Sequence, residues 1–439
     1  MAYLAAVDLG SSSGKIWLGQ VGNGDLTAEE IYRFDHTPAA RGGALYWEWE
    51  QICAEVIRGL RLAAQAAPEK IIAVSCDSWA QDFGLLDKNG ELFYEPVSYL
   101  SGRADAIPDE IASLIPADEL VQLAGVRRIS EISTLAQWKY MANCEPGNLQ
   151  KAGRLLPVGD LVNFKLSGNA VLNFSLASAA MLLEKGSCKC NRTLLKKLGL
   201  DPQLAGEFCN GPGVIGKTVV GDAVPPELAG IPVISGIGHD TAAAFYGCEV
   251  LPGEAALSLG SWAMLGTPEN NFAEVAGTSV IGIIPDQYVR ISYCHGMRLL
   301  QQCILQWKTQ GVWRGFEEFD AAVKKSDFAG TFDVSATHCP PPGGDMLKEI
   351  SDHCSEIPES MADFGKAICR SIARGIAGQL AILEKAANCR FRCLKVAGGG
   401  TADPNLMEEL QCLLPYPLIP VSREASVLGN LLIQERIAG

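Results

Sequence analysis

The chain has 439 residues, enough for two domains that each bury a core of their own. Apolar residues make up 48% of it and charged residues 20%, a balance typical of globular proteins and unlike that of disordered chains. The formal net charge of −14 argues against binding of nucleic acid or an anionic membrane through a general basic surface, and no apolar run is long enough to span a bilayer.

The N-terminus leads directly into a strand. Met1-Ala2-Tyr3 precedes the apolar run from Leu4, with no basic region followed by an apolar stretch, so we expect no cleaved leader and a cytoplasmic protein. The run reaches Asp8, a turn of glycines and serines follows over 10–14, and a second apolar-rich strand begins at Lys15. This pattern predicts a β-hairpin.

The turn of this hairpin has the composition of a phosphate site. Its backbone N–H groups and serine hydroxyls can surround phosphate oxygens, and Asp8 can hold a hydrated Mg²⁺. It is not a Walker A loop, because three residues rather than four separate Gly10 from Gly14-Lys15, and Ile16 follows where that motif has Ser or Thr. The alternative is a plain turn that binds nothing.

Strands and a helix alternate after the hairpin. Strands are predicted near 31–34 and 71–76, with a helix over 49–66 between them whose apolar residues recur at helical spacing. The second strand leads into Asp77-Ser78-Trp79-Ala80-Gln81-Asp82. An aromatic face beside carboxylates suits a sugar, which presents C–H faces and hydroxyl edges. The alternative is that Trp79 belongs to the core.

The middle of the chain leads to a second aspartate at a strand end. Helices are expected between 108 and 143 and over 161–167, and 210–216 is predicted to be loop or turn. An apolar run from Val233 then ends in glycines and delivers His239-Asp240-Thr241, with small residues after it as at the start of a helix. The Asp of this triplet could accept a proton from a substrate hydroxyl. The alternative is that it only caps the helix.

The rest of the chain repeats the strand–glycine–strand pattern. A second hairpin is predicted over 256–266 around Gly260-Ser261, and a third glycine turn, Gly398-Gly399-Gly400, follows an apolar strand. Three glycine turns and two strand-end aspartates suggest a duplicated nucleotide-binding scaffold. We expect a domain boundary near residue 246 and a cleft between the two halves.

Three helices and a loop complete the second half. The helices are predicted over 299–309, over 362–387 and from Asn405 onward. The proline- and glycine-rich stretch 340–345 is predicted to be an exposed loop.

The fifteen cysteines do not form a disulfide framework. Those inside apolar segments are expected to be small core residues: Cys76, Cys303, Cys369 and Cys412. The short-spaced pairs Cys188/Cys190 and Cys389/Cys393 have no histidine nearby, so zinc is not the expected ligand. We therefore expect reduced thiols.

Six segments taken together resemble the FGGY family of carbohydrate kinases, and within it most of all the rhamnulokinases. They occur in the family's order from residue 7 to residue 430. The segments are Val7–Lys15, Asp77–Asp87, Gly238–Ala242, Ser258–Trp262, Gly398–Gly400 and Glu424–Asn430.

This resemblance implies an α/β fold of two actin-like, ribonuclease H-like ATPase domains, as in the hexokinase–Hsp70–actin superfamily, with a cleft between them. Residues 1–245 would form the domain on the sugar and phosphate side, and 246–439 the domain on the nucleotide side. The implied reaction transfers the γ-phosphate of Mg-ATP to a hydroxyl of a ketose. The implied partner is a small-molecule sugar, and a homodimer is the assembly to be expected.

The resemblance also assigns roles to residues. Asp240 would be the general base, and Asp8 would orient Mg²⁺ or its waters. The sugar would be held by His239, Thr241, Trp79, Ala80, Asp82 and Arg103. The nucleotide would be held by Gly10, Ser11, Ser12, Ser13, Gly14, Lys15, Gly260, Ser261, Gln301, Gly399 and Gly400.

Several positions depart from the rhamnulokinase pattern. Ala80 replaces a glycine in the sugar segment, Leu100 and Ser101 replace an arginine and an aspartate, and Tyr293 stands where the family has an asparagine. Xylulose, fuculose or glycerol are therefore alternative acceptors. Two other classes of function also stay open, a non-catalytic regulator on the kinase scaffold and an actin-like ATPase that moves a partner protein.

Overall fold

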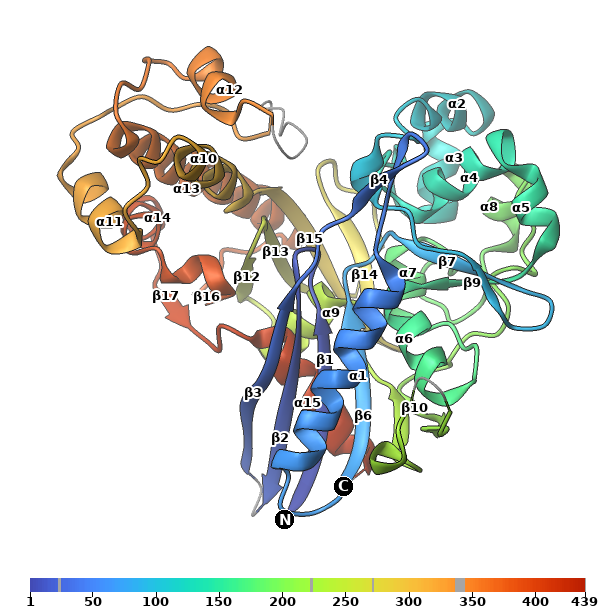
Figure 1. Ribbon diagram of the computed structural model, residues 1–439. Coiled ribbons are helices and arrows are strands. Elements are labelled where there is room, and N and C mark those ends of the chain that lie inside the picture. Colours follow the sequence, from blue (N-terminus) through green and yellow to red (C-terminus); the bar gives the residue numbers. More distant parts are fainter. Residues whose placement is uncertain (23–24, 222–223, 271, 336–343, 439) are drawn as a thin grey trace.

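Two six-stranded sheets dominate the computed structural model (Figure 1), which describes residues 1–22, 25–221, 224–270, 272–335 and 344–438. Most of the predicted loop at 340–345 lies outside the described residues. Within the described residues, no helix combines the length and apolar character that a membrane crossing requires.

The first sheet begins with the predicted hairpin. Its order is β10-β11-β6-β1-β2-β3. These strands span Gly213–Lys217, Pro232–Ser235, Ile71–Ser78, Ala2–Leu9, Ser13–Gly22 and Asp25–Asp35. The strands β1, β2 and β3 are antiparallel, and β6 and β11 continue the sheet in parallel with β1.

The second sheet repeats this plan over five of its strands, and each sheet has one further antiparallel strand at an edge, β10 in the first and β14 in the second. Its order is β14-β15-β13-β12-β16-β17. These strands span Ser279–Ile284, Gln287–His295, Trp262–Glu269, Ala255–Leu259, Leu394–Ala397 and Leu418–Pro420. Again a hairpin is extended by an antiparallel strand on one side and by two parallel strands on the other. The expected duplication of the scaffold is therefore confirmed.

Helices α1 and α15 cover opposite faces of the first sheet (Figure 1). Helix α1 spans Trp49–Ala66, as predicted, and buries its apolar stripe against β2 and β3. Helix α15, Ala425–Ala438, is the last element of the chain, yet it packs on β1 and β6 through Val427 and Leu431. The final helix thus returns to the first sheet, although the division at residue 246 predicted from the sequence would assign it to the second half.

A lobe of short elements lies between β6 and β11 in the sequence. Its core is built around Trp138 and Phe83, both fully buried. Strands β7, β8 and β9 span Phe83–Asp87, Leu92–Tyr94 and Ala152–Pro157; α2 to α8 span Ile107–Leu114, Ala117–Ala124, Thr134–Cys144, Pro146–Lys151, Val158–Ser167, Phe174–Ala179 and Arg192–Lys197. The ribbon β4 (Ala39–Arg41) and β5 (Ala44–Tyr46) and the 3₁₀ turn Tyr99–Ser101 border it.

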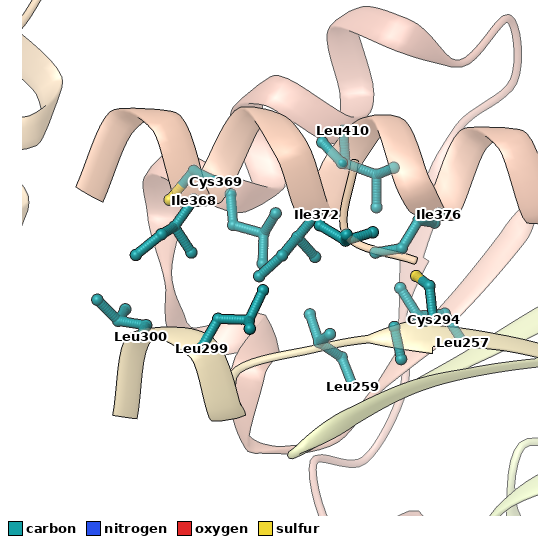
Figure 2. Packing of buried hydrophobic residues seen from close by; sticks show 14 of the residues in the cluster. Leu257, Leu259, Cys294, Leu299, Leu300, Ile368, Cys369, Ile372, Ile376 and Leu410 are labelled. Carbon is teal, nitrogen blue, oxygen red and sulfur yellow. The ribbon is translucent and has the colours of Figure 1, made fainter. Parts of the chain in front are cut away.

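The long helix α13, Met361–Ala387, forms the centre of the second core. Figure 2 shows Ile368, Ile372 and Ile376 of this helix packed toward Leu259 of β12 and Leu299 of α10. Around them lie α10 to α12 and α14, over Arg298–Thr309, Phe316–Lys325, Met346–His353 and Pro404–Leu413, and the 3₁₀ turn Gly399–Ala402. The three helices predicted for this half are therefore confirmed.

Two predictions about local structure were wrong. Part of the segment 210–216, expected to be loop or turn, forms the edge strand β10. Cys412 is exposed on α14 instead of buried, whereas Cys76, Cys303 and Cys369 are buried as expected. All cysteines in the described ranges are free thiols.

Candidate active site

A cavity of about 990 Å³ lies between the two sheets. The first sheet contributes the β1–β2 turn, and the chain after β6 and β11 contributes Trp79 and Asp240. The second sheet contributes the β12–β13 turn at Gly260-Ser261, and Gly399 follows β16. The cavity is at the upper end of the size range of small-molecule sites.

Three strand ends of the first sheet meet at one edge of this cavity. Asp8 of β1 lies opposite Asp77 of β6 in the parallel register. At the end of β6, the amide of Ser78 donates to the carbonyl of Gly238 over 2.9 Å. This bond holds the segment before Asp240 beside the end of β6. The ends of adjacent parallel strands are a common place for ligand sites, because their loops point the same way.

Asp240 is the first residue of α9, Asp240–Gly247. Its Oδ1 accepts hydrogen bonds from the amide and the hydroxyl of Thr241. Burial and the nearby carboxylate of Asp8 nevertheless raise the pKa of Asp240 to about 7. A carboxylate with this pKa can accept a proton from a hydroxyl near neutral pH. It therefore suits the role of a general base.

His239 lies beside this carboxylate as a neutral imidazole. Burial lowers the pKa of its ring to about 4. Its Nε2 is 3.5 Å from Oδ1 of Asp240, and its Nδ1 has no hydrogen-bond partner among the described residues. A buried nitrogen without a partner at a cavity wall can bind a hydroxyl of a ligand.

The β1–β2 turn has its serines at the cavity and a basic residue beside them. Gly10 N–H donates to the Ser13 carbonyl over 3.0 Å, which closes the turn. Lys15 Nζ lies 3.4 Å from Asp8 and 2.5 Å from Glu424. Burial works against the charge of Lys15, but these two carboxylates outweigh it and raise the pKa of the ammonium above its ordinary value.

Most of the predicted site residues line the cavity. These are Asp8, Gly10, Ser11, Ser12, Ser13, Lys15, Trp79, Ala80, His239, Asp240, Thr241, Gly260, Ser261 and Gly399. The predicted residues outside its lining are Gly14, Asp82, Arg103, Gln301 and Gly400.

Two of the predicted glycines face the protein interior. A Cβ at Gly14 would lie 2.2 Å from the ring of Phe34, and one at Gly400 would lie 2.6 Å from the side chain of Leu259. These two glycines therefore allow close packing. At Gly260 and Gly399 a Cβ would meet nothing within 4 Å, so both leave open space at the cavity.

Asp82 and Arg103 lie behind the cavity wall, so the predicted direct contact with a sugar does not fit their positions. Asp82 is fully buried and accepts from Trp47 Nε1 at 2.7 Å, Trp79 Nε1 at 3.0 Å and Gln137 Nε2 at 3.0 Å. Arg103 donates to the same Gln137 over 3.1 Å. Both oxygens of Asp82 are thus occupied, and this network fixes the ring of Trp79.

The structure adds residues to the site that the sequence motifs did not assign to it. Gln81 lines the cavity in a left-handed conformation, φ 81°, and is held by hydrogen bonds to Thr134 and Gln137 of α4. Tyr99 and Glu424 also line the cavity. Gln81 and Glu424 stand inside segments quoted for the family resemblance, and Tyr99 stands next to the departures Leu100 and Ser101; these positions were the only available signal.

The departures from the rhamnulokinase pattern differ in their relation to the cavity. Ala80 lines it, and so does Tyr293, which is 47% exposed and meets the ring of Trp262 edge to face at 5.7 Å. Leu100 and Ser101 do not line it. The Ser101 hydroxyl accepts from the amide of Leu45 instead.

A buried polar network supports the segment that carries Asp240. Asn173 accepts the amide of Gly238 over 3.2 Å and donates to the carbonyl of Gly236 over 2.9 Å. The backbone N–H of Asn173 donates to Oδ2 of Asp160 over 2.8 Å. Burial raises the pKa of Asp160 to about 8, so this carboxyl holds a proton in the folded protein at neutral pH.

Replacing Asp160 with Asn should make the protein relatively more stable as the pH rises. An unfolded Asp loses its proton near pH ~4, whereas folded Asp160 keeps its proton to about pH 8. The folded state of the parent protein therefore loses stability between these values, and the asparagine of the variant has no proton to lose. The measurement is the difference in unfolding midpoint between D160N and the parent at pH 5 and pH 8. A difference that does not grow with pH would contradict this assignment.

The acidic strand ends are suited to a divalent cation that arrives with phosphates. Burial and the charge of Asp8 raise the pKa of Asp77 well above its ordinary value, and Asp8 also raises that of Asp240. A cation would relieve this repulsion. In the described residues, no three His, Cys, Asp or Glu side chains are grouped as a complete metal site. Mg²⁺ is usually held by one or two carboxylates together with substrate phosphates and water, and the carboxylates at these strand ends are donors of that kind.

Comparisons with known proteins agree with this geometry. Residues 3–247 match the N-terminal domain of the FGGY family of carbohydrate kinases. A rhamnulokinase from Oceanobacillus iheyensis is 27% identical, with 98% of this chain and 92% of the relative covered. A rhamnulokinase from Bacteroides thetaiotaomicron is also 27% identical, with 99% of this chain and 90% of the relative covered.

Solved structures share the fold. A xylulose kinase from Lactobacillus acidophilus superimposes with a TM-score of 0.80 at 14% identity, over 99% of this chain and 89% of that one. A glycerol kinase from Plasmodium falciparum superimposes with a TM-score of 0.79 at 13% identity, over 99% of this chain and 89% of that one. The predicted actin-like α/β fold is thereby confirmed.

Proposed function

Because the chain belongs to the FGGY family of carbohydrate kinases, we propose that it transfers the γ-phosphate of Mg-ATP to a hydroxyl of a ketose, with rhamnulose as the first candidate. Asp240 is the general base in this proposal. The observation that carries it is a carboxylate with a pKa of about 7 in the same cavity as two glycine–serine turns. In-line phosphoryl transfer needs this combination of a proton acceptor and phosphate ligands.

The sugar would lie against the first sheet in this proposal. His239 and Thr241 would bind its hydroxyls next to Asp240, and Trp79 with Ala80 would face its C–H groups. Asp82 and Arg103 would act on the sugar indirectly, because they hold Trp79 and its neighbours from behind.

The nucleotide would lie across the two sheets. Ser11, Ser12 and Ser13 with the Gly10 turn would surround the β- and γ-phosphates, and Gly260-Ser261 would approach them from the second sheet. Asp8 would hold Mg²⁺ or its waters, and the ion supplies charge neutralisation on the phosphates. Gly399 would lie near the adenosine end.

The choice of sugar depends on the positions that depart from the rhamnulokinase pattern. The replaced pair Leu100 and Ser101 lies off the cavity, which favours retention of the rhamnulokinase acceptor. Ala80 lies on the cavity wall, where one added methyl group narrows the pocket relative to glycine. Xylulose, fuculose and glycerol therefore belong in the test.

The test is coupled ADP-release kinetics with Mg-ATP and a panel of ketoses, aldoses and polyols. One acceptor should raise ADP release far above the rate without sugar. A flat panel with ATP binding intact would favour the regulator, and sugar-independent ATP hydrolysis would favour the ATPase. A cytoplasmic location, a homodimer and a boundary at residue 246 stay predictions alongside this one.

A further inference from the structure

Glu424 stands where the chain crosses from the second sheet back to the first. Strand β17 of the second sheet ends at Pro420, and α15 on the first sheet begins at Ala425. Glu424 is the last residue of this crossover, and its side chain lines the cavity. An acidic side chain at a site for an anionic nucleotide weakens binding by repulsion unless it acts on a cation there.

Its contacts show which cation it acts on. Oε2 of Glu424 lies 2.5 Å from Lys15 Nζ, and Oε1 lies 3.8 Å from Arg33. In the first sheet, Lys15 is paired with Asp8 on one side and with Arg33 on the other. Although Asp8 is the neighbour in register, the ammonium is closer to Glu424, at 2.5 Å against 3.4 Å.

The crossover is also held rigidly. The carbonyl of Arg423, the residue before Glu424, accepts from the amide of Gly398 over 3.1 Å. On the other side α15 is pressed against α9, and a Cβ built at Gly247 of α9 would lie only 2.2 Å from the carbonyl of Ala425. Glu424 therefore has a fixed position relative to both the third glycine turn and the helix of Asp240.

We propose that Glu424 is a positioning residue that draws the Lys15 ammonium toward its own carboxylate, so that only a long contact of 3.4 Å to Asp8 remains, and thereby keeps Asp8 available for the cation of the nucleotide. The inference rests on the proposed role of Asp8. Without the Glu424 charge, Asp8 is the remaining carboxylate at Lys15 in the described structure. The ammonium then competes with Mg²⁺ for Asp8.

The test measures nucleotide binding, so it does not depend on finding the sugar. ADP binding is titrated by calorimetry at a series of free Mg²⁺ concentrations for the parent and for Glu424→Gln, a change of charge with little change of shape. The variant should need about fivefold more Mg²⁺ for half-maximal ADP affinity, the size of effect expected for a pair of this exposure. Glu424→Asp should raise the Mg²⁺ requirement less than Glu424→Gln does, because it keeps the negative charge.

Two further variants show whether the effect passes through Lys15. In a Lys15→Met background the ammonium is absent, so adding Glu424→Gln should not change the Mg²⁺ requirement further. Glu30→Gln is the matched control, since Glu30 also pairs with Arg33 but does not line the cavity. It should leave the requirement unchanged.

The outcomes are distinct from those of the sugar panel. An unchanged Mg²⁺ requirement in Glu424→Gln, or an equal shift with and without Lys15, would overturn the proposal. Tighter ADP binding at every Mg²⁺ concentration would also overturn it, because Glu424 would then act only by repulsion. A sugar panel with no active acceptor refutes the kinase reaction and leaves the ADP titration interpretable.

Discussion

Replacing Asp240 with Asn should lower sugar-dependent ADP release by about 10²-fold or more, the usual contribution of a general base. Asn keeps the size of the side chain and can still accept from Thr241, but it cannot take the proton of the attacking hydroxyl. Binding of ATP and of the sugar should survive the change. The measurement is kcat with the acceptor identified in the panel, together with calorimetric binding of both substrates. Asp352→Asn, which changes an exposed carboxylate of α12, is the control and should retain full activity.

The pH dependence of the reaction gives a second readout of the same group. A base works only when it has lost its proton, so kcat/KM should fall as the pH drops through about 7, the raised pKa of Asp240. An unshifted Asp would place this fall near pH ~4. The acidic limb should disappear from the residual activity of Asp240→Asn. If it persists at the same pH, another group is the base.

Replacing Gly429 with Ala should cause a large loss of folding stability. A Cβ at this position of α15 would lie 1.9 Å from the carbonyl oxygen of Ala243 in α9. The obstacle is backbone, which cannot rotate away as a side chain can, so the two helices must separate. We expect a loss of about 3 kcal/mol in the free energy of unfolding, at the upper end of the usual cost of overpacking. Urea unfolding measures it.

The matched control for this change is Gly378→Ala in α13. That glycine is also inside a helix, but a Cβ there meets nothing within 4 Å. It should stabilise the protein by about 0.5–1 kcal/mol, the helix preference of Ala over Gly. Activity should fall in Gly429→Ala as well, because α9 carries Asp240. Equal stability of the two variants would show that the α9–α15 contact is not tightly packed.

The sequence was sufficient for elements whose signal is local. Helix α1 begins and ends where its apolar spacing does, and the two glycine–serine hairpins form because a strand, a turn and a strand follow one another directly. Strand β10 was missed because Gly213 and Gly216 lie inside it and its side chains are only partly buried. A glycine-rich edge strand and a loop have the same composition.

The depth of a side chain was the part of the site that the sequence did not determine. Asp82 and Trp79 stand three residues apart in one motif, but only Trp79 reaches the cavity, because the chain turns inward at Gln81. Glu424 becomes part of the site only through the return of α15 to the first sheet. Such a contact joins residues 409 positions apart, as Lys15 and Glu424 are, and no local pattern indicates it.

The return of α15 also constrains how the protein is made. Leu4 and Ala6 of the first strand are buried together with Val427 and Leu431 of the last helix. During synthesis at roughly 5–20 residues per second, that face of the first sheet has no cover for tens of seconds after its strands have left the ribosome. The nascent chain therefore passes through a long interval in which this apolar sheet face is still without the helix that covers it in the folded protein.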